Sequence, residues 1–132
     1  MESSAVQRWA ETYRLAWEEA DSEAVAGLFA EDGIYRNDIY QDQPNQGRAG
    51  VADYWTTVTT SQSEASVRMG APVVDGKRAV VEFWTTMKVD GEPVTLAGAL
   101  LLEFDDEGLC TSLREYYNFT PGFHEPPIGW GT

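Results

Sequence analysis

One carboxylate in the C-terminal third of the chain occupies a position that favours acid–base chemistry. Glu115 alternates with Leu113 and Tyr117 along a strand-like run, so the three side chains share one face of a strand. An acid on an apolar face loses hydration, and its pKa rises toward the neutral range in which proton transfer is most effective. Glu115 is therefore the best catalytic candidate in this sequence.

The same residue has a structural interpretation. Glu115 could pair with a buried Tyr or Trp donor, or lie at a strand end open to water, and perform no chemistry. The functional interpretation adds Tyr13 and Tyr117 as hydrogen-bond donors that could stabilise an oxyanion. Asn37 and Asp38 lie near the expected cavity edge and are candidates for orienting a substrate.

Helical patterns dominate the first half of the chain. Apolar residues at three- and four-residue steps predict one helix from Ser4 to Ala20, a shorter one after Asp21 and a third around Val51 to Val58. A short strand from Ile34 to Asn37 and a loop from Asp38 to Gly47 separate the last two helices.

Alternating patterns dominate the second half. They predict four antiparallel strands at about residues 64–74, 78–89, 93–105 and 108–119, joined by Asp-Gly and Gly-containing turns. Three helices on one face of such a curved sheet make an α+β domain. Residues 120–132 are rich in Pro and Gly but carry Phe123, Ile128 and Trp130, so we expect a tail that docks on the domain or on a partner subunit.

The strand register assigns two apolar faces to the sheet. The inward face and the helices together form a predicted ligand-binding wall. Its members could also be ordinary core residues. They are Trp17, Tyr35, Tyr54, Trp55, Phe83, Met87, Leu100, Leu113 and Tyr117. The outward face, around Trp84, Leu101 and Tyr116, is too apolar to face water. We therefore expect a homodimer joined through this face.

Composition excludes several classes of protein. A net charge of -13, from 22 acidic and 9 basic residues, opposes binding to nucleic acid. One cysteine and one histidine make a Cys/His metal site implausible, and no phosphate-loop or dinucleotide motif predicts a cofactor. The N-terminus lacks a signal peptide and no apolar run suits a membrane span, so we expect a cytoplasmic protein without a membrane partner.

The phrase LFAEDGIYR followed by GRAGVADYW, in this order of elements, resembles the nuclear transport factor 2-like superfamily. The resemblance is to SnoaL-like polyketide cyclases and ketosteroid isomerases in particular, and it runs from about Val6 to Phe119. It implies a cystatin-like conical roll with a mixed edge to its sheet, a ligand cavity between helices and sheet, and a dimer. Residues 1–132 then form a single SnoaL-like domain. The fold alone does not specify an activity.

Comparison with the ketosteroid isomerase pattern removes one mechanism. The resemblance places Tyr13 where the isomerase has its oxyanion-binding tyrosine. The catalytic aspartate falls on Asn37, which cannot accept a proton at neutral pH, and the protonated aspartate falls on Leu100. Two of the three catalytic groups are thus absent, which argues against steroid isomerisation by that mechanism.

Two kinds of function remain open. The first is a small-molecule pocket protein that acts as a cofactor-independent cyclase, isomerase, dehydratase or hydrolase on an apolar carbonyl or polycyclic substrate. The second is a non-catalytic module that binds a small apolar or aromatic molecule, or one that serves as a dimeric interaction partner. The volume of the cavity and the pKa of Glu115 would separate them.

Overall fold

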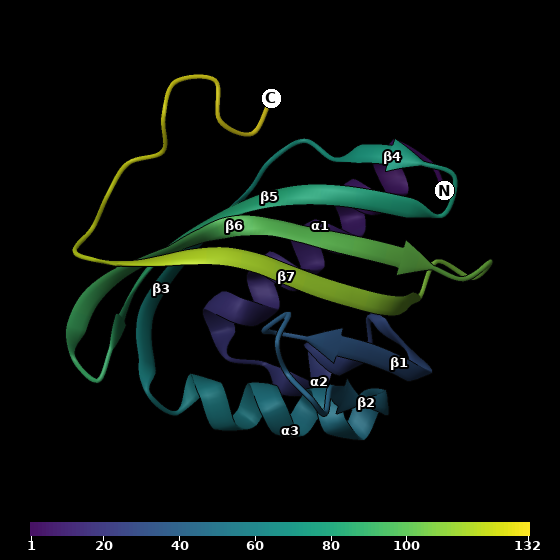
Figure 1. Cartoon of the computed structure of the whole chain (residues 1–132), viewed down its shortest axis with the longest axis horizontal. Helices are drawn as coiled ribbons and strands as arrows, with labels where there is room; N and C mark the ends of the chain where they lie inside the picture. Colours follow the sequence, from purple (N-terminus) through teal and green to yellow (C-terminus); the bar gives the residue numbers. More distant parts are fainter.

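Three helices pack against one face of a curved sheet in the computed structural model, which covers residues 1–132 (Figure 1). The helices are α1 (Ser3–Glu19), α2 (Ser22–Ala26) and α3 (Gly47–Thr59). The strands are β1 (Phe29–Arg36), β2 (Asn45–Gln46), β3 (Gln62–Met69), β4 (Val73–Asp75), β5 (Arg78–Val89), β6 (Glu92–Phe104) and β7 (Cys110–Pro121). No helix has both the length and the apolar character needed to cross a membrane.

The sheet has seven strands and is mixed, so the prediction of four antiparallel strands was wrong. Its order is β2-β1-β7-β6-β5-β3, with β4 paired to β5, and β1 runs parallel to β7. The apolar stripe of the short helix predicted after Asp21 includes Phe29, whereas in the structure α2 ends at Ala26 and Phe29 begins β1. Exposed Glu31 and Asp32 and a shift of register against β7 between Phe29 and Ile34 interrupt the alternation by which a strand is recognised.

Two other boundaries differ from the prediction. The expected strand at residues 64–74 is divided into β3 and β4. Pro72 lies between them and has no N–H to donate to a sheet ladder. Asn45–Gln46, expected within a loop, forms the edge strand β2 beside Ile34 and Tyr35 of β1.

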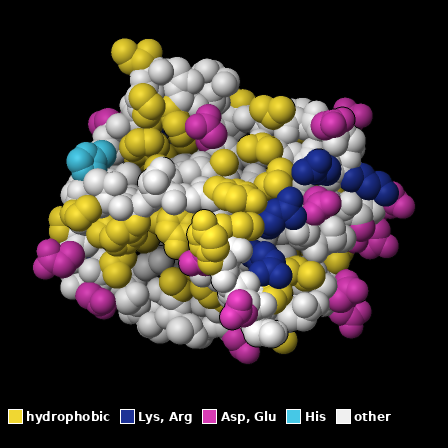
Figure 2. Space-filling view, viewed as in Figure 1, with side chains coloured by type: hydrophobic (Ala, Val, Ile, Leu, Met, Phe, Trp, Pro, Cys, Tyr) yellow, Lys and Arg dark blue, Asp and Glu magenta, His cyan; other side chains and the backbone are white.

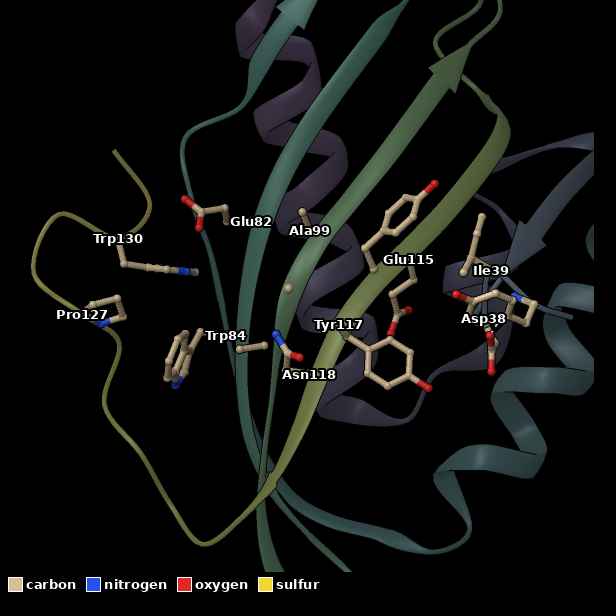
Figure 3. A pocket seen from close by; sticks show the side chains of 14 residues that line it. Asp38, Ile39, Glu82, Trp84, Ala99, Glu115, Tyr117, Asn118, Pro127 and Trp130 are labelled. Carbon is tan, nitrogen blue, oxygen red and sulfur yellow. Dashed lines mark hydrogen bonds between the residues drawn. The ribbon is translucent and has the colours of Figure 1, made fainter.

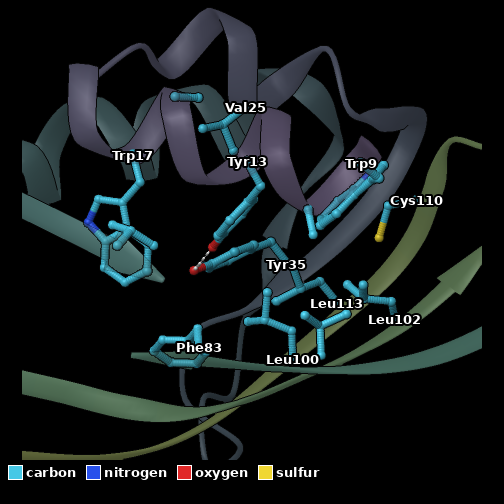
Figure 4. Packing of buried hydrophobic residues seen from close by; sticks show 14 of the residues in the cluster. Trp9, Tyr13, Trp17, Val25, Tyr35, Phe83, Leu100, Leu102, Cys110 and Leu113 are labelled. Carbon is cyan, nitrogen blue, oxygen red and sulfur yellow. Dashed lines mark hydrogen bonds between the residues drawn. The ribbon is translucent and has the colours of Figure 1, made fainter. Parts of the chain in front are cut away.

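The pairing of β5, β6 and β7 determines which side chains face the helices. Val81 pairs with Leu100, which pairs with Glu115, so these residues share one face of the sheet. All three are buried. Figure 4 shows Trp9, Tyr13 and Trp17 of α1 packed toward this face, with Tyr35 and Phe83 nearby.

Gly98 lies where β6 approaches β7 most closely. A Cβ atom at this position would collide with the carbonyl oxygen of Tyr116 and lie 2.7 Å from the Cα atom of Tyr117. Only glycine allows the two strands to come this close. Gly98 is opposite Tyr117 and therefore maintains the contact between β6 and β7 two residues from Glu115.

The C-terminal residues after β7 turn back and run along the β5 side of the sheet (Figure 1), and apolar side chains gather on the outer face of the sheet (Figure 2). The indole N–H of Trp84 donates to the carbonyl oxygen of His124 at 2.8 Å. Trp130 packs edge-on against Trp84, with ring centroids 6.0 Å apart, and the guanidinium of Arg68 lies 5.3 Å from the Trp130 ring. The tail thus contacts its own domain through aromatic and cationic groups.

Candidate functional site

An inner cavity of about 190 Å³ lies between the helices and the sheet. Its aromatic lining residues are Trp17, Tyr35, Tyr54, Trp55, Tyr117 and Phe119. Four aliphatic residues, Val58, Met87, Val89 and Leu96, and four polar ones, Asn37, Ser61, Gln62 and Glu115, complete the lining. Glu115 is the only charged residue among them, and no Lys, Arg or His lines the cavity.

Glu115 is held on β7 with little access to water. Glu115 is only 6% exposed, and its Oε1 atom accepts a hydrogen bond of 2.7 Å from the hydroxyl of Tyr35. Oε2 has no donor from the protein. Burial raises the pKa of Glu115 from an ordinary value of 4.5 to about 7, and the hydrogen bond from Tyr35 partly opposes the shift.

Two tyrosines form a chain that ends on this carboxylate. The Tyr13 and Tyr35 hydroxyls lie 3.4 Å apart (Figure 4). Because the Tyr35 hydroxyl donates its hydrogen bond to Glu115, its oxygen is free to accept one from Tyr13. Tyr13 is fully buried and does not line the cavity, so it acts on Glu115 through Tyr35.

The surrounding tyrosines stay protonated throughout the neutral range. Burial, and secondarily the charge of Glu115, raises the pKa of Tyr13, Tyr35, Tyr54 and Tyr117 above the usual value. Glu115 is consequently the group whose charge changes near pH 7. In one form it can accept a proton through Oε2, and in the other it can donate one.

An outer groove of about 800 Å³ lies on the opposite face of the sheet (Figure 3). Its floor includes Trp84, Ala97, Ala99 and Tyr116; one wall is Asp38, Ile39 and Tyr40, and the other is Pro127 and Trp130. Glu115 and Tyr117 border both the groove and the inner cavity.

A free strand edge explains how Glu115 can border two spaces. The pairing of β1 with β7 ends at Arg36 and Arg114, so β7 continues past Glu115 without a neighbour on that side. The loop with Asp38 and Ile39 lies across this edge (Figure 3). Glu115 lies at this gap, where the outer groove and the inner cavity meet.

The predicted ligand-binding residues divide into two sets. Trp17, Tyr35, Tyr54, Trp55, Met87 and Tyr117 line the inner cavity. Phe83, Leu100 and Leu113 do not line it and are fully buried in the core.

The predicted polar candidates also separate. Asn37 lines the cavity, and its Oδ1 atom accepts a hydrogen bond of 3.1 Å from Asn45. Asp38 lies outside the cavity, where its Oδ1 atom accepts from the backbone N–H of Tyr40 at 2.9 Å. The structure therefore brings Asn37 into the inner cavity, whereas Asp38 lines the outer groove that Glu115 also borders.

Several lining residues were missed by the sequence interpretation. Phe119 continues the alternation of Glu115 and Tyr117, so extending that pattern by one step would have found it. Gln62 had no such signal because the expected strand began two residues later. In the structure its Oε1 atom accepts from the indole N–H of Trp17 at 3.0 Å, which fixes that ring at the cavity wall.

The family model that matches residues 6–113 describes a SnoaL-like domain. The match spans most of the chain, and the chain belongs to the SnoaL-like domain family. No curated protein sequence matches the chain significantly.

Solved structures share the fold at low sequence identity. A ketosteroid isomerase-like protein from Catenulispora acidiphila, described in complex with trimethylamine, is 21% identical with a TM-score of 0.75, covering 83% of this chain and 85% of that one. SalBIII, described as an epoxide hydrolase/cyclase-like enzyme in salinomycin pyran-ring formation, is 19% identical with a TM-score of 0.74, covering 87% and 94%. A protein from Mycobacterium tuberculosis described as an LEH-like epoxide hydrolase is 19% identical with a TM-score of 0.70, covering 87% and 84%. These likenesses establish a ketosteroid isomerase-like α+β fold.

Proposed function

We propose that this protein binds a small organic molecule in the inner cavity and exchanges a proton with it through Glu115. The observation that carries the proposal is a buried carboxylate with one oxygen held by Tyr35 and the other without a protein donor. Its pKa of about 7 allows both proton states under ordinary conditions. The free oxygen is the atom that meets the ligand.

The cavity volume favours a small ligand. Sites for drug-sized ligands usually exceed roughly 300 Å³, whereas this cavity has about 190 Å³. A polycyclic substrate, one of the options left open by the sequence, would require the walls to move apart. The Catenulispora relative is described with trimethylamine, which is also a small organic molecule.

A cofactor-independent enzyme of the isomerase, cyclase or dehydratase type is the second candidate. The tyrosines near Glu115 favour it, because a carboxylate that removes a proton beside a carbonyl needs donors for the oxyanion that forms. Tyr54 and Tyr117 line the cavity and could supply them. Deuterium incorporation from D2O into small cyclic ketones, followed by NMR, tests this candidate. Exchange by wild type that Glu115→Gln abolishes would support it.

The binding proposal is tested by titrating Glu115 itself. Proteins labelled with ¹³C at glutamate side-chain carboxyls would be followed by NMR from pH 3 to pH 9, and the Glu115→Gln spectrum identifies the resonance. We expect a midpoint near 7, because the carboxylate is desolvated. A midpoint at the ordinary glutamate value would contradict the proposal, since it would indicate a solvated acid.

A further inference from the structure

The inner cavity contains a negative charge that no protein cation neutralises. Oε1 of Glu115 accepts from neutral Tyr35, and Oε2 makes no protein hydrogen bond. No basic side chain lines the cavity. Burying a carboxylate without a counter-ion costs free energy, and a positively charged ligand would offset that cost by pairing with it.

The aromatic walls around this carboxylate meet at steep angles. Trp17 and Trp55 have ring centroids 5.4 Å apart at 74°, and Tyr54 and Trp55 are 6.0 Å apart at 90°. The planes of Tyr35 and Tyr54 are closer to parallel, at 35°, with ring centroids 5.1 Å apart. All four rings line the inner cavity, so they present π-faces or edges to one small space from several directions. Aromatic cages of this kind bind alkylated ammonium groups through cation–π attraction.

We propose that the ligand of the inner cavity is a small organic ammonium ion, with its positive charge beside Oε2 of Glu115 and its alkyl groups against Trp17, Tyr54 and Trp55. This inference rests on the proposed function, because it assigns a ligand class to the same site. It refines the expectation of an apolar ligand, because the proposed ligand has an apolar body and a positively charged head group.

Electrostatics at the entrance favour the same ligand class. Asp38 lies on the loop beside the free edge of β7, and its charge contributes to the raised pKa of Tyr117 at the cavity wall. The whole chain carries a net charge of -13. The local charge of Asp38 and the net negative charge of the chain both attract cations and repel anions. The other titratable groups around Glu115 are Tyr13, Tyr35, Tyr54 and Tyr117, which remain neutral and do not compete for the cation.

The test compares two ligands of nearly the same shape. Choline carries a quaternary nitrogen where 3,3-dimethylbutan-1-ol carries a neutral carbon. Binding of each would be measured by calorimetry at pH 8, where Glu115 is ionised. We expect choline to bind wild type at least about tenfold more tightly, as is typical of a desolvated cation–aromatic and ion-pair contact.

Two variants identify the source of the preference. Glu115→Gln should remove the preference for choline. Glu82→Gln removes one negative charge from the exposed outer face and should leave the preference unchanged. Choline should also lower the NMR midpoint of Glu115 in wild type, because a nearby cation favours the carboxylate.

Equal binding of the two ligands by wild type would overturn the inference, and so would failure of both to bind. The wild-type comparison requires no variant, so a folding defect in Glu115→Gln cannot hide this result. The proposed function has a separate readout in the Glu115 titration without ligand. A midpoint near 7 without charge selectivity would reject the ammonium ligand alone, whereas an ordinary midpoint would reject the proton-exchange function.

Discussion

The two faces of the same sheet give two glutamates opposite surroundings. Glu115 faces the helices in a space of about 190 Å³, while Glu82 faces an open groove of about 800 Å³. Glu82 is exposed and accepts from the backbone N–H of Gly131 in the tail. Glu115 is buried and accepts from a buried tyrosine hydroxyl. Residue type is the same on both faces, so desolvation makes only one of them a candidate for proton transfer.

The close contact between β6 and β7, two of the strands that separate these faces, depends on Gly98. Gly98→Ala places a Cβ atom against the backbone of Tyr116 and Tyr117, so β6 and β7 must move apart beside Glu115. We expect a loss of about 3 kcal/mol or more in the free energy of unfolding, at the upper end for overpacking. Urea denaturation would measure it. Gly27→Ala is the matched control, because its added Cβ meets no atom closer than 3.4 Å, and an equal loss in both variants would refute the strand-contact explanation.

The burial of Glu115 should make stability depend on pH. Its pKa is 4.5 in ordinary surroundings and about 7 in the folded protein, so the folded state binds the proton more tightly. Stability from this group is complete below about pH 4.5, falls as pH rises toward 7 and is constant above.

Replacing Glu115 removes this pH dependence. Relative to wild type, Glu115→Gln should gain about 3 kcal/mol between pH 4 and pH 8, the free energy equivalent of the pKa shift. Urea denaturation at both pH values measures the difference, with Glu82→Gln as the outer-face control. A stability difference that does not change with pH would show that Glu115 titrates normally.

The outer face should join two copies of the chain. Leu101 lies on this face beside Val80 and Arg114. The tail leaves it partly exposed. Light scattering should give the mass of a dimer for wild type, and Leu101→Glu should weaken the dimer by roughly 30-fold, or about 2 kcal/mol, because it buries a charge in an apolar contact. A wild-type protein that stays monomeric at all concentrations would disprove this expectation.

The tyrosine chain should adjust the pKa of Glu115. Tyr35→Phe removes the hydrogen bond that stabilises the carboxylate, so the pKa should rise by about one further unit, as expected for a bond to a charged group. Tyr13→Phe should have a smaller effect in the same direction, because Tyr13 acts through Tyr35. NMR titration of wild type, Tyr35→Phe and Tyr13→Phe would rank the pKa of Glu115 in the three proteins. An unchanged midpoint in Tyr35→Phe would exclude this role.

The contact of the tail with the outer face should contribute least. Trp130→Ala removes the packing on Trp84 and the contact with Arg68, which should cost about 1 kcal/mol. Ile128→Ala, at a fully exposed position of the same tail, should cost nothing measurable. Urea denaturation of the two variants would detect the difference, and equal stabilities would mean that the tail contact is energetically neutral.

Local patterns predicted the parts of the molecule that local forces determine. Alternation along β7 placed Glu115 and Leu113 on one buried face, and helical spacing placed Trp9, Tyr13 and Trp17 on one side of α1. The Asp-Gly turns aligned β5 with β6 correctly enough to identify that face.

Long-range contacts could not be predicted in this way. The sequence suggested that Glu115 could pair with a buried Tyr or Trp donor without indicating which one, and the structure assigns that hydrogen bond to Tyr35. Tyr35 reaches Glu115 because β1 pairs in parallel with β7, and no local pattern encodes a pairing between distant strands. The positions of Asp38 outside the cavity and Gln62 within it depend on the same tertiary arrangement.

The parallel pairing of β1 with β7 also has a consequence for biosynthesis. Tyr35 and Glu115 are 80 residues apart, and β7 is the last strand of the chain. The ribosome must therefore synthesise the chain through residue 115 before the carboxylate can meet its donor, whereas α1, α2 and α3 can form earlier. Until then the apolar surface intended for β7 remains uncovered. Chains that stall before β7 is complete should accordingly be prone to aggregation and recognised by chaperones, and the hydrogen bond between Tyr35 and Glu115 should form only after β1 and β7 have paired.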